Sequence, residues 1–549
     1  MPRNKVRNSR GLDVPVWRVF LRRYARIAVF LILLVSLALL LLRVWLGPVK
    51  GLISARSTLN VSAVAFLCFC GWLVKPRLQQ GTPPISLSFR GRSLAIGGVL
   101  VATVAAFIPS LWFPFLFDDY VHLLFVSTES WRTLTERVLI HHPTGGDMFF
   151  RPFGDLTFQL VYQWSGFDFR RWHLTGLAIH AANTLLVLLL SRRICGAWLG
   201  GCAGALFFGW QAAHAEAVSW VSALYDLLAT LFVLLALLEV TGERKRYLAA
   251  AAFAALACLS KESAYCLPLL AGLSATLVPR EARRISWWKT LWVTTACALV
   301  FLYRYSYLRG IGGYRTASGG SLAVHFQWLS ALQAIGLRLW AVLFIPVNWS
   351  VPPDPALRLG FVFLFAGVLG FAACASLPPQ RLASLAAFAA CAALPALSLL
   401  LIGSDLAGAR ILYLPTVGAA LLWASIAASV PNRKIAVGLC SLLALFQLTA
   451  LEHNEAVWGS VARTARQACV DAGVILRHDP RSTLFAIDLP RTRNGVYFLQ
   501  NGFPACVAIN ADVDASRIEV GNSVPSPLKP NEDVVVWNDA LGRLVIGKK

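Results

Sequence analysis

Two adjacent carboxylates, Asp118 and Asp119, follow a long apolar run and are well suited to general-base chemistry. A carboxylate can take the proton of an attacking hydroxyl group, and it can also help to hold a divalent cation such as Mg²⁺ or Mn²⁺. Aspartate is equally common as the N-cap of a helix, so the pair alone leaves a structural role open. Consecutive side chains diverge on a helix or an extended chain, so we expect the two residues to have different roles.

Three cations beside apolar runs could bind an anionic group such as a phosphate. They are Arg151, Lys261 and Arg410. The guanidinium group is always charged and suits phosphate recognition, and a cation at headgroup depth can meet a lipid phosphate. Two structural alternatives remain open: Arg151 could snorkel to the membrane interface, and Lys261 could form a salt bridge with Glu262 that holds a helical hairpin.

Further polar residues interrupt the apolar runs and predict a supporting cluster. An acid within an apolar run, such as Asp226, is a functional candidate unless it pairs with another span. A lone histidine in an apolar helix is usually a hydrogen-bonded core residue, and we favour that interpretation for His180. The predicted supporting cluster comprises His173, His214, Glu216, Asp226, Glu262 and Tyr413.

The composition shows that these residues must be positioned by membrane helices. The chain has 549 residues, of which 57% are hydrophobic and 14% are charged, whereas soluble domains carry roughly 25% charged residues. A soluble enzyme and a disordered chain are therefore excluded. The net charge of +23 does not indicate a nucleic-acid partner, because the basic excess lies in short loops beside apolar runs. Residues 1–92, for example, hold 15 Lys and Arg against the single acid Asp13.

Thirteen apolar runs predict membrane-spanning helices, because backbone in lipid must satisfy its own hydrogen bonds. We expect the segment 320–347 to be a re-entrant or interfacial helix, since a further span there would put Arg381 outside. The Lys and Arg distribution then places the N-terminus in the cytoplasm and the outer loop 114–171 and the C-terminal tail on the opposite face. The predicted spans lie at about 27–46, 58–75, 93–113, 172–190, 194–211, 217–240, 247–260, 262–278, 289–308, 357–377, 381–402, 410–430 and 434–451.

The expected fold is an all-α polytopic membrane protein with about 13 transmembrane helices and a small C-terminal α/β cap. Three regions are predicted: a basic N-terminus with two extra spans (1–92), a membrane core (93–451) and a C-terminal domain (452–549). In the last region we expect an amphipathic helix at 453–476. Cys469 and Cys506 could pair there if the compartment is oxidising. The expected strands are 483–487, 496–499, 507–509, 534–537 and 544–546.

The expected topology brings the chemically capable residues to one side of the membrane. A transporter would more often place its ionisable residues at mid-depth. The residues that converge on the outer side are Asp118, Asp119, Arg151, His214, Glu216, Lys261 and Arg410.

In the order of its motifs the chain resembles polytopic GT-C membrane glycosyltransferases that use lipid-linked sugars. It is most similar to the transmembrane protein O-mannosyltransferases that carry tetratricopeptide repeats, and to their bacterial relatives. The likeness covers about residues 93–460, but two extra spans precede that core and no repeats follow it. The matching residues are, in chain order, Asp118-Asp119, Arg151-Pro152, Trp172-His173, His180-Ala-Ala-Asn183, His214-Ala-Glu216-Ala-Val-Ser-Trp220, Asp226-Leu-Leu, Ser260-Lys261-Glu262 and Arg410-Ile-Leu-Tyr413-Leu-Pro415.

The resemblance implies an inverting transfer from a polyprenyl-phosphate-linked sugar, for which mannose is a candidate. We favour Asp118 as the base, because it comes first after the span and is similar to the leading acid of the family. The acceptor, whether protein, lipid or glycan, stays open, as does a divalent cation at Asp118 or Asp119. We expect an integral protein of the inner or plasma membrane with its active site outside the cytoplasm. Alternatives are a lipid-carbohydrate transporter or flippase and a noncatalytic envelope scaffold.

Overall fold

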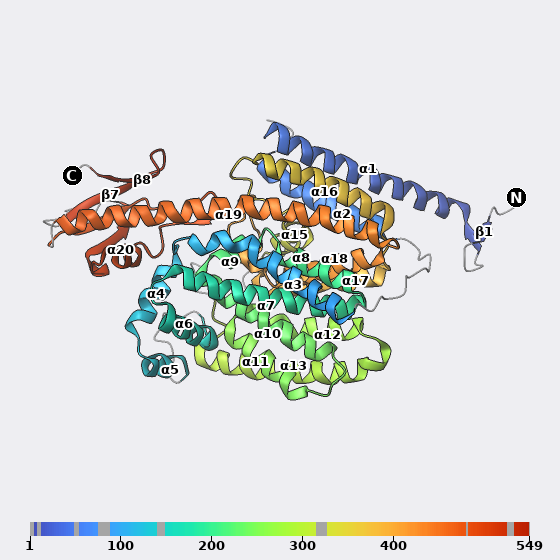
Figure 1. Ribbon diagram of the computed structural model, residues 1–549, viewed down its shortest axis with the longest axis horizontal. Coiled ribbons are helices and arrows are strands. Elements are labelled where there is room, and N and C mark those ends of the chain that lie inside the picture. The colour runs from blue at the N-terminus through green and yellow to red at the C-terminus, as the bar shows by residue number, and fades with distance from the viewer. Residues whose placement is uncertain are drawn as a thin grey trace.

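The computed structural model describes residues 5–7, 13–48, 54–74, 88–139, 149–313, 327–478, 481–523 and 532–547. Figure 1 shows a broad body of helices with a small sheet-containing unit at one end. A short N-terminal hairpin of β1 (Lys5–Arg7) and β2 (Asp13–Pro15) precedes the body. The long helices of the body are α1 (Val16–Leu46), α2 (Ala55–Leu73), α3 (Phe89–Phe107), α7 (Phe169–Cys195), α8 (Trp198–Gly209), α10 (Leu224–Thr241), α11 (Tyr247–Ser260), α12 (Leu267–Leu277), α13 (Arg280–Leu308), α16 (Pro355–Cys374), α17 (Pro379–Ala393), α18 (Pro415–Ser429) and α19 (Arg433–His478).

Shorter elements connect these helices on the side where the candidate residues gather. The described residues of the predicted outer loop form three short helices, and several short 3-10 helices begin or end the longer helices. These elements are η1 (Ile108–Trp112), α4 (Asp118–Thr128), α5 (Trp131–Leu139), α6 (Pro152–Ser165), α9 (His214–Ser219), η2 (Val221–Ala223), η3 (Glu262–Cys266), η5 (Leu394–Leu399) and η6 (Ala409–Leu412).

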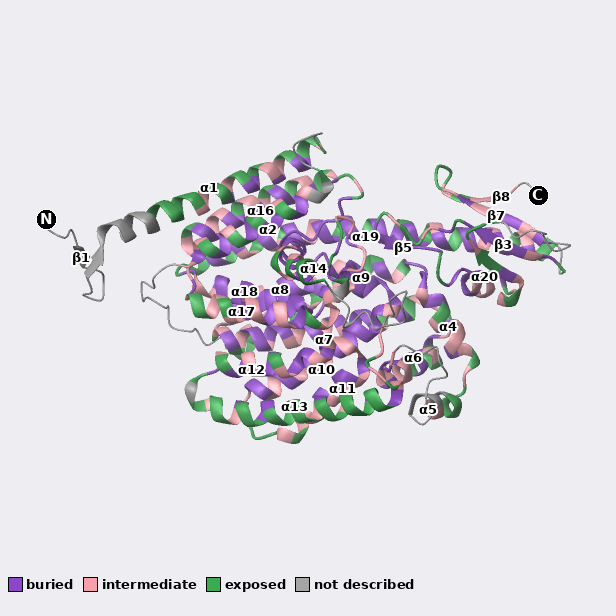
Figure 2. Ribbon diagram, turned by 180° about the vertical axis from the view of Figure 1, so that it is seen from behind, coloured by how far each residue is buried: buried purple, intermediate pink, exposed green. Residues whose placement is uncertain are grey.

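Each of the thirteen predicted apolar runs contains a helix, which confirms the polytopic helical class. Within the described residues, eight helices are long and apolar enough to cross a membrane, and five apolar helices are shorter. The chain is therefore an integral membrane protein by the length and composition of its helices, while the count of thirteen spans stays a prediction. Figure 2 shows α8 and α18 largely buried and α13 with exposed residues along its outer side. Exposed apolar residues on α13, such as Leu299 and Leu302, are suited to contact with lipid.

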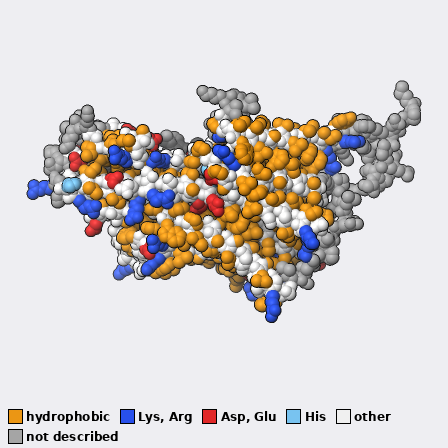
Figure 3. Space-filling view, turned by 45° about the horizontal axis from the view of Figure 1, so that its top comes forward, with side chains coloured by type: hydrophobic (Ala, Val, Ile, Leu, Met, Phe, Trp, Pro, Cys, Tyr) orange, Lys and Arg blue, Asp and Glu red, His pale blue; other side chains and the backbone are white. Residues whose placement is uncertain are grey.

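The apolar surface is distributed as a membrane protein requires. Figure 3 shows apolar side chains over the body of helices, whereas charged side chains are denser over the end that holds the C-terminal unit. Helices α1, α2 and α16 lie side by side along one edge of the body, and α10 to α13 form the opposite side (Figure 1). Helices α1 and α2 thus lie far from α11 and from the predicted cation Lys261, which directly follows α11.

After Gly313, the described chain begins again at residue 327, and residues 328–344 form one helix with an irregular turn. It comprises α14 (Trp328–Gln333), a π-helical turn η4 (Ala334–Arg338) and α15 (Leu339–Phe344), and α15 packs against α2. The expectation that 320–347 is re-entrant or interfacial stays a prediction. Its first part, 320–326, lies outside the described residues.

The C-terminal region corrects three sequence-based predictions. The predicted span 434–451 and the predicted amphipathic helix 453–476 form one continuous helix, α19, because no residue at the junction breaks it. Residues 507–509 are not a strand, since they lie within α20 (Phe503–Ala511). The strand β6 (Ile518–Gly521) was not expected.

The other expected strands are present, although the second is short. The first and the last two join β6 in a small mixed sheet beside α19 and α20. Its strand order is β6-β3-β7-β8, with β3 (Thr483–Ile487) parallel to both β6 and β7 (Glu532–Asn538). β8 (Arg543–Ile546) runs antiparallel to β7, and a two-residue pairing joins β4 (Thr492–Arg493) to β5 (Val496–Tyr497). Phe498 and Phe503 of this unit share a hydrophobic core with Phe117 and Trp220 of the body.

Candidate active site

A sharp backbone turn starts α4 and sets the direction of the two aspartates. Phe117 is the residue before α4 and has φ 53° and ψ −116°, in a region that residues with a side chain rarely occupy. Such backbone strain persists only where the surroundings enforce it, and it is common at functional sites. Asp118 and Asp119 then occupy the first turn of the helix.

Asp119 is fully engaged in holding the start of α4. Its Oδ2 accepts a hydrogen bond from the Leu116 amide (3.0 Å), and its Oδ1 accepts from the Ser222 amide (2.7 Å) and hydroxyl (2.6 Å). The side chain is buried, and burial raises its pKa to about 7 against the lowering effect of these donors. Asp119 therefore ties α4 to η2.

Asp118 points elsewhere and lines a cavity. Its Oδ1 accepts a hydrogen bond from Nδ2 of Asn501 in the C-terminal unit, and among the described residues no other donor reaches the carboxylate. Burial raises the pKa of Asp118, while the Asn501 hydrogen bond and the positive charges of Arg410 and Arg491 lower it. The two carboxylates diverge as expected, and Asp118 is the one that remains available to a substrate.

The cavity has a volume of about 460 Å³ and combines a polar end with an apolar end. Asp118 and the cations are at the polar end. The apolar end reaches the surface between α12, α13 and η5, where Leu269 and Leu399 are about half exposed (51% and 46%). The lining includes Asp118, Arg151, Asp226, Lys261, Glu262, Leu269, Phe301, Arg304, Leu394, Leu399 and Arg410.

Each predicted cation is held by an acid from a distant segment. Nζ of Lys261 lies 2.5 Å from Oδ2 of Asp226, and Nη1 of Arg410 lies 2.5 Å from Oε1 of Glu216. The Arg410 guanidinium also lies over the Trp220 ring, with its carbon 4.3 Å from the ring centre. These contacts fix both cations before any ligand binds.

Glu262 bonds two arginines rather than its neighbour Lys261. Nη2 and Nε of Arg151 lie 2.9 and 3.0 Å from Oε2 of Glu262, and Nη2 of Arg304 lies 3.6 Å from Oε1. The backbone of Lys261 is extended between α11 and η3, so the two consecutive side chains diverge. The alternative of a local Lys261–Glu262 salt bridge is therefore wrong.

Four members of the predicted supporting cluster lie outside the cavity lining: Glu216, which pairs with Arg410, and His173, His214 and Tyr413. His173 has its Nε2 3.0 Å from the Phe113 carbonyl oxygen and supports the chain before α4. His214 is fully buried, with its ring centre 4.5 Å from that of Tyr413. The Tyr413 hydroxyl lies 2.7 Å from Nδ1 of His180, which confirms His180 as a hydrogen-bonded core residue. Tyr413 follows η6 directly and so anchors the turn that carries Arg410.

Several residues of the site were missed by sequence reasoning. Arg304 carried a usable signal, because it is a charged residue inside a predicted span. Tyr225 donates a hydrogen bond of 2.7 Å to Asp155, and its ring packs so closely on Gly154 that a Cβ there would lie 2.2 Å from it. Asn501 carried no local signal, because only the tertiary fold brings it to α4.

The site does not fit the divalent cation that was considered for Asp118 or Asp119. The part of the chain that the structure describes contains no group of three or more His, Cys, Asp or Glu residues arranged to hold a metal ion. The two carboxylates point apart, and both oxygens of Asp119 already accept hydrogen bonds from protein donors.

Comparison with known proteins finds similarity among solved structures only. No protein-family model matches the chain, and no curated protein matches it. Two crystal structures of ArnT from Cupriavidus metallidurans, one bound to undecaprenyl phosphate and one in the apo state, are similar to it. Each shares 17% identity, covers 82% of this chain and 94% of its own, and has a TM-score of 0.37. ArnT is a GT-C glycosyltransferase, the class that the motifs resemble. The likeness concerns the fold, so the function is argued from the site.

Proposed function

We propose that this protein is a membrane glycosyltransferase that moves a sugar from a polyprenyl-phosphate donor to an acceptor hydroxyl group. The observation that carries the proposal is a single cavity that joins an available carboxylate, Asp118, to fixed cations and to an apolar opening. A donor of this class needs all three, because it carries a reactive sugar, an anionic phosphate and a hydrocarbon chain.

Arg410 and Lys261 are the proposed ligands of the donor phosphate. Negative charge develops on the phosphate as the bond to the sugar breaks, and preorganised cations stabilise it. The cavity lining contains four cations, Arg151, Lys261, Arg304 and Arg410, and three acids, Asp118, Asp226 and Glu262. Glu216, which pairs with Arg410, is a fourth acid beside them. A donor phosphate that binds there therefore competes with Glu216 for Arg410 and with Asp226 for Lys261.

The apolar end of the cavity suits the polyprenyl chain. Phe301 of α13 and Leu394 and Leu399 of η5 line it, and these side chains are partly exposed on the apolar face of the body. A hydrocarbon chain can leave there into the bilayer while the phosphate stays at the cations. The reacting centre is thereby held at the membrane boundary.

Asp118 is the proposed general base. Its carboxylate takes the proton from the acceptor hydroxyl as the oxygen forms a bond to the anomeric carbon. The bond from that carbon to the phosphate oxygen breaks at the same time, and polyprenyl phosphate leaves with the electron pair. A single displacement of this kind inverts the anomeric configuration. Asp119 keeps α4 in place and takes no proton.

The finer assignments rest on the motif resemblance and on the charge distribution. The resemblance makes mannose a candidate for the sugar. The Lys and Arg distribution supports a site on the extracytoplasmic face of an inner or plasma membrane. The acceptor is a protein, lipid or glycan hydroxyl group.

The proposal is tested by mass analysis of envelope glycans and glycoproteins from cells with and without the gene. We expect a sugar modification to disappear without it, to return with the wild-type gene and to stay absent with Asp118→Asn. Arg192→Ala, at the C-terminal end of α7 and outside the cavity, is the matched control and should restore the modification. Full restoration by both Asp118→Asn and Asp119→Asn, tested as single variants, would contradict the enzymatic proposal and favour a transporter.

A further inference from the structure

The C-terminal unit reaches over the polar end of the cavity through the segment 494–502. In this segment the Tyr497 ring centre lies 5.1 Å from those of Phe117 and Trp220. The guanidinium carbon of Arg410 lies 5.3 Å from the same tyrosine ring centre. Tyr497 of the C-terminal unit thus contacts Phe117, which directly precedes the proposed base. It also contacts Arg410, the proposed phosphate ligand, and the Trp220 ring on which Arg410 stacks.

The same segment makes a polar contact with the proposed base. Nδ2 of Asn501 donates a hydrogen bond to Oδ1 of Asp118, across 383 positions of sequence. The next residue, Gly502, has φ +81°, and a Cβ there would lie 2.4 Å from the Phe117 carbonyl oxygen. The glycine therefore lets the two backbones approach where Phe117 itself has a positive φ.

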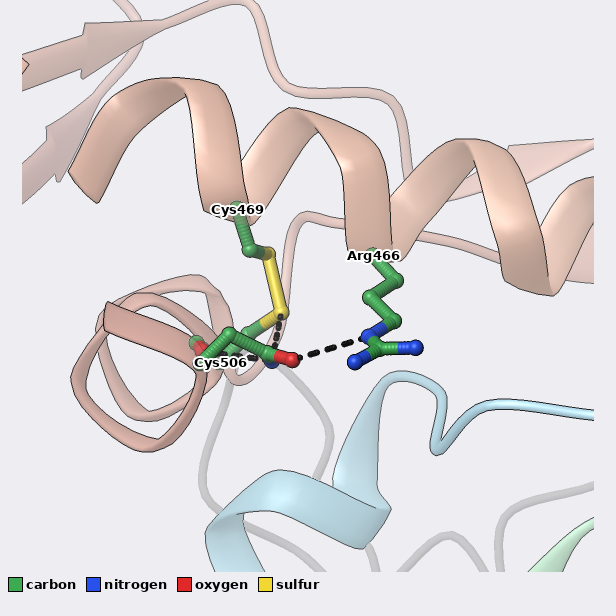
Figure 4. Close-up of a disulfide and its surroundings, with 4 residues drawn as sticks. Arg466, Cys469 and Cys506 are labelled. Carbon is green, nitrogen blue, oxygen red and sulfur yellow. Dashed lines mark hydrogen bonds between the residues drawn. A yellow bond between two sulfur atoms is a disulfide. The ribbon is translucent and has the colours of Figure 1, made fainter. Parts of the chain in front are cut away.

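A covalent tie holds this segment against the body. Gly502 precedes α20, and its carbonyl accepts a 2.8 Å hydrogen bond from the Cys506 amide. Cys506 forms the disulfide with Cys469 of α19 that the sequence allowed, as Figure 4 shows. Arg466 of α19 adds a hydrogen bond of 3.2 Å to Asn510 of α20. The start of α20 is thereby fixed to the same continuous helix that crosses the body.

We propose that Asn501 is a positioning residue for Asp118, held in place by the disulfide-tied start of α20. The inference rests on the proposed function of Asp118 as the base. The amide group fixes Oδ1 and leaves Oδ2 directed to the acceptor hydroxyl. The C-terminal unit is then a necessary part of the active site, because the membrane core by itself does not orient the carboxylate.

The charged surroundings of Asp118 give this role a measurable signature. Arg410 of η6 and Arg491 in the loop after β3 favour its ionised form, and Asp119 and His122 are the titratable neighbours on α4. The Asn501 amide also favours the ionised carboxylate, because it donates to it. Loss of the amide should therefore raise the pKa of Asp118, whereas a merely structural contact would leave the titration unchanged.

The test is a pH titration of the carboxyl band of Asp118 by difference infrared spectroscopy on the full-length purified protein. The Asp118→Asn variant assigns the band. We expect Asn501→Ala to shift its midpoint upward by on the order of one pH unit. Asn501→Asp should shift it further, because a second carboxylate then faces the first. The matched control is Gln500→Ala, which changes the exposed neighbouring residue and should leave the midpoint unchanged.

A second measurement links the titration to turnover and to the disulfide. In complemented cells, Asn501→Ala should lower the envelope sugar modification about tenfold, as expected for a disturbed general base. The pair Cys469→Ser with Cys506→Ser should shift the Asp118 midpoint in the same direction as Asn501→Ala.

The outcomes separate the two proposals. An unchanged Asp118 midpoint and unchanged modification in Asn501→Ala would overturn the positioning role, even if Asp118→Asn is inactive. Full modification in Asp118→Asn would remove Asp118 as the base, and full modification in both Asp118→Asn and Asp119→Asn would contradict the proposed function.

Discussion

Lys261 and Asp226 form an ion pair of 2.5 Å that joins η3 to the first turn of α10. Both side chains are mostly buried, with 15% and 6% of their surfaces exposed. Removing one partner of such a pair leaves an uncompensated charge in a poorly solvated place, which costs more than the pair itself contributes. If Lys261 binds the donor phosphate as we propose, the pair has two separable roles, in stability and in donor binding.

We expect Asp226→Asn to lower the free energy of unfolding by on the order of 3 kcal/mol, because Lys261 is left without its anion. The double variant Lys261→Met with Asp226→Leu should recover much of that stability and still fail to bind undecaprenyl phosphate. Thermal unfolding in detergent, with and without that lipid, measures both effects. Lipid stabilisation of the double variant equal to wild type would remove Lys261 from the phosphate site.

Arg410 should be sensitive even to substitution by lysine. Arg410→Ala loses a charge-assisted contact to the leaving phosphate, which predicts a loss of roughly 2–4 kcal/mol in kcat/KM. Arg410→Lys keeps the charge, but it loses the planar group that stacks on Trp220 and bonds Glu216, so we expect only partial recovery. The measurement is transfer from polyprenyl-phosphate mannose in membranes, and Arg246→Ala, an exposed residue, serves as the control.

Lys261→Ala should act in the same direction as Arg410→Ala. Full activity in both variants would show that neither cation binds the phosphate. The pairing of each with a buried acid would then be purely structural.

Substitutions of the adjacent residues Asp118 and Asp119 should affect catalysis and stability separately. Asp118→Asn removes the basic carboxylate from the cavity and should lower kcat by ~10²–10⁴-fold, with thermal stability close to wild type. Asp119→Asn places an amide NH₂ among three hydrogen-bond donors, so we expect it to lower stability by about 1–3 kcal/mol. Paired measurements of turnover and of the unfolding temperature test this. Near-normal turnover in Asp118→Asn would pass the role of base to Asp119.

The sequence was informative wherever a single segment determines its own structure. Apolar runs predict helices because lipid leaves the backbone no other partner, and each predicted run contains one. The polar stretch around Glu452 and Asn454 marks the expected exit of α19 from the membrane, but polarity alone does not end a helix. Residues 507–509 are too short a run to distinguish strand from helix, although Pro504 after Gly502 is typical of a helix start.

The pairing of the site residues could not be read from the chain. The convergence of Lys261 and Arg410 followed from topology, because both adjoin ends of spans on one face. Their acid partners depend on how helices pack, and the contact between Asn501 and Asp118 depends on how the C-terminal unit docks on α4. Short polar motifs thus predict which types of residue lie at the site. Tertiary contacts decide which of the two adjacent aspartates remains available to a substrate.

As the pH is lowered, turnover should begin to fall at a pH above the pKa of an ordinary aspartate. A general base acts in its ionised form, and burial raises the pKa of Asp118 above 3.8. Activity is therefore present above the raised pKa and lost as the pH falls through it. The pH profile of kcat measures this limb, and Arg491→Ala should move it to higher pH because one favourable positive charge is lost. An acid limb at or below the ordinary value would contradict the assignment of Asp118 as the base.

The orientation in the membrane can be tested with cysteines on the two predicted faces of the membrane. Replacement of the ten free cysteines by serine, with Cys469 and Cys506 kept, provides the background. A membrane-impermeant maleimide added outside should label Ser130→Cys and Gln500→Cys. It should reach Lys245→Cys and Arg284→Cys only after permeabilisation, because Arg and Lys clusters stay in the cytoplasm.

The result decides where the active site opens, because α11 begins just after Lys245 and ends beside Lys261. With 14 residues the helix rises about 21 Å, which is less than a hydrocarbon core of about 30 Å. A cytoplasmic Lys245 therefore leaves Lys261 recessed below the opposite headgroups, at a depth that a lipid-borne phosphate can reach. Labelling of Arg284→Cys from outside would put Lys261 at the cytoplasmic face and contradict transfer at the outer face.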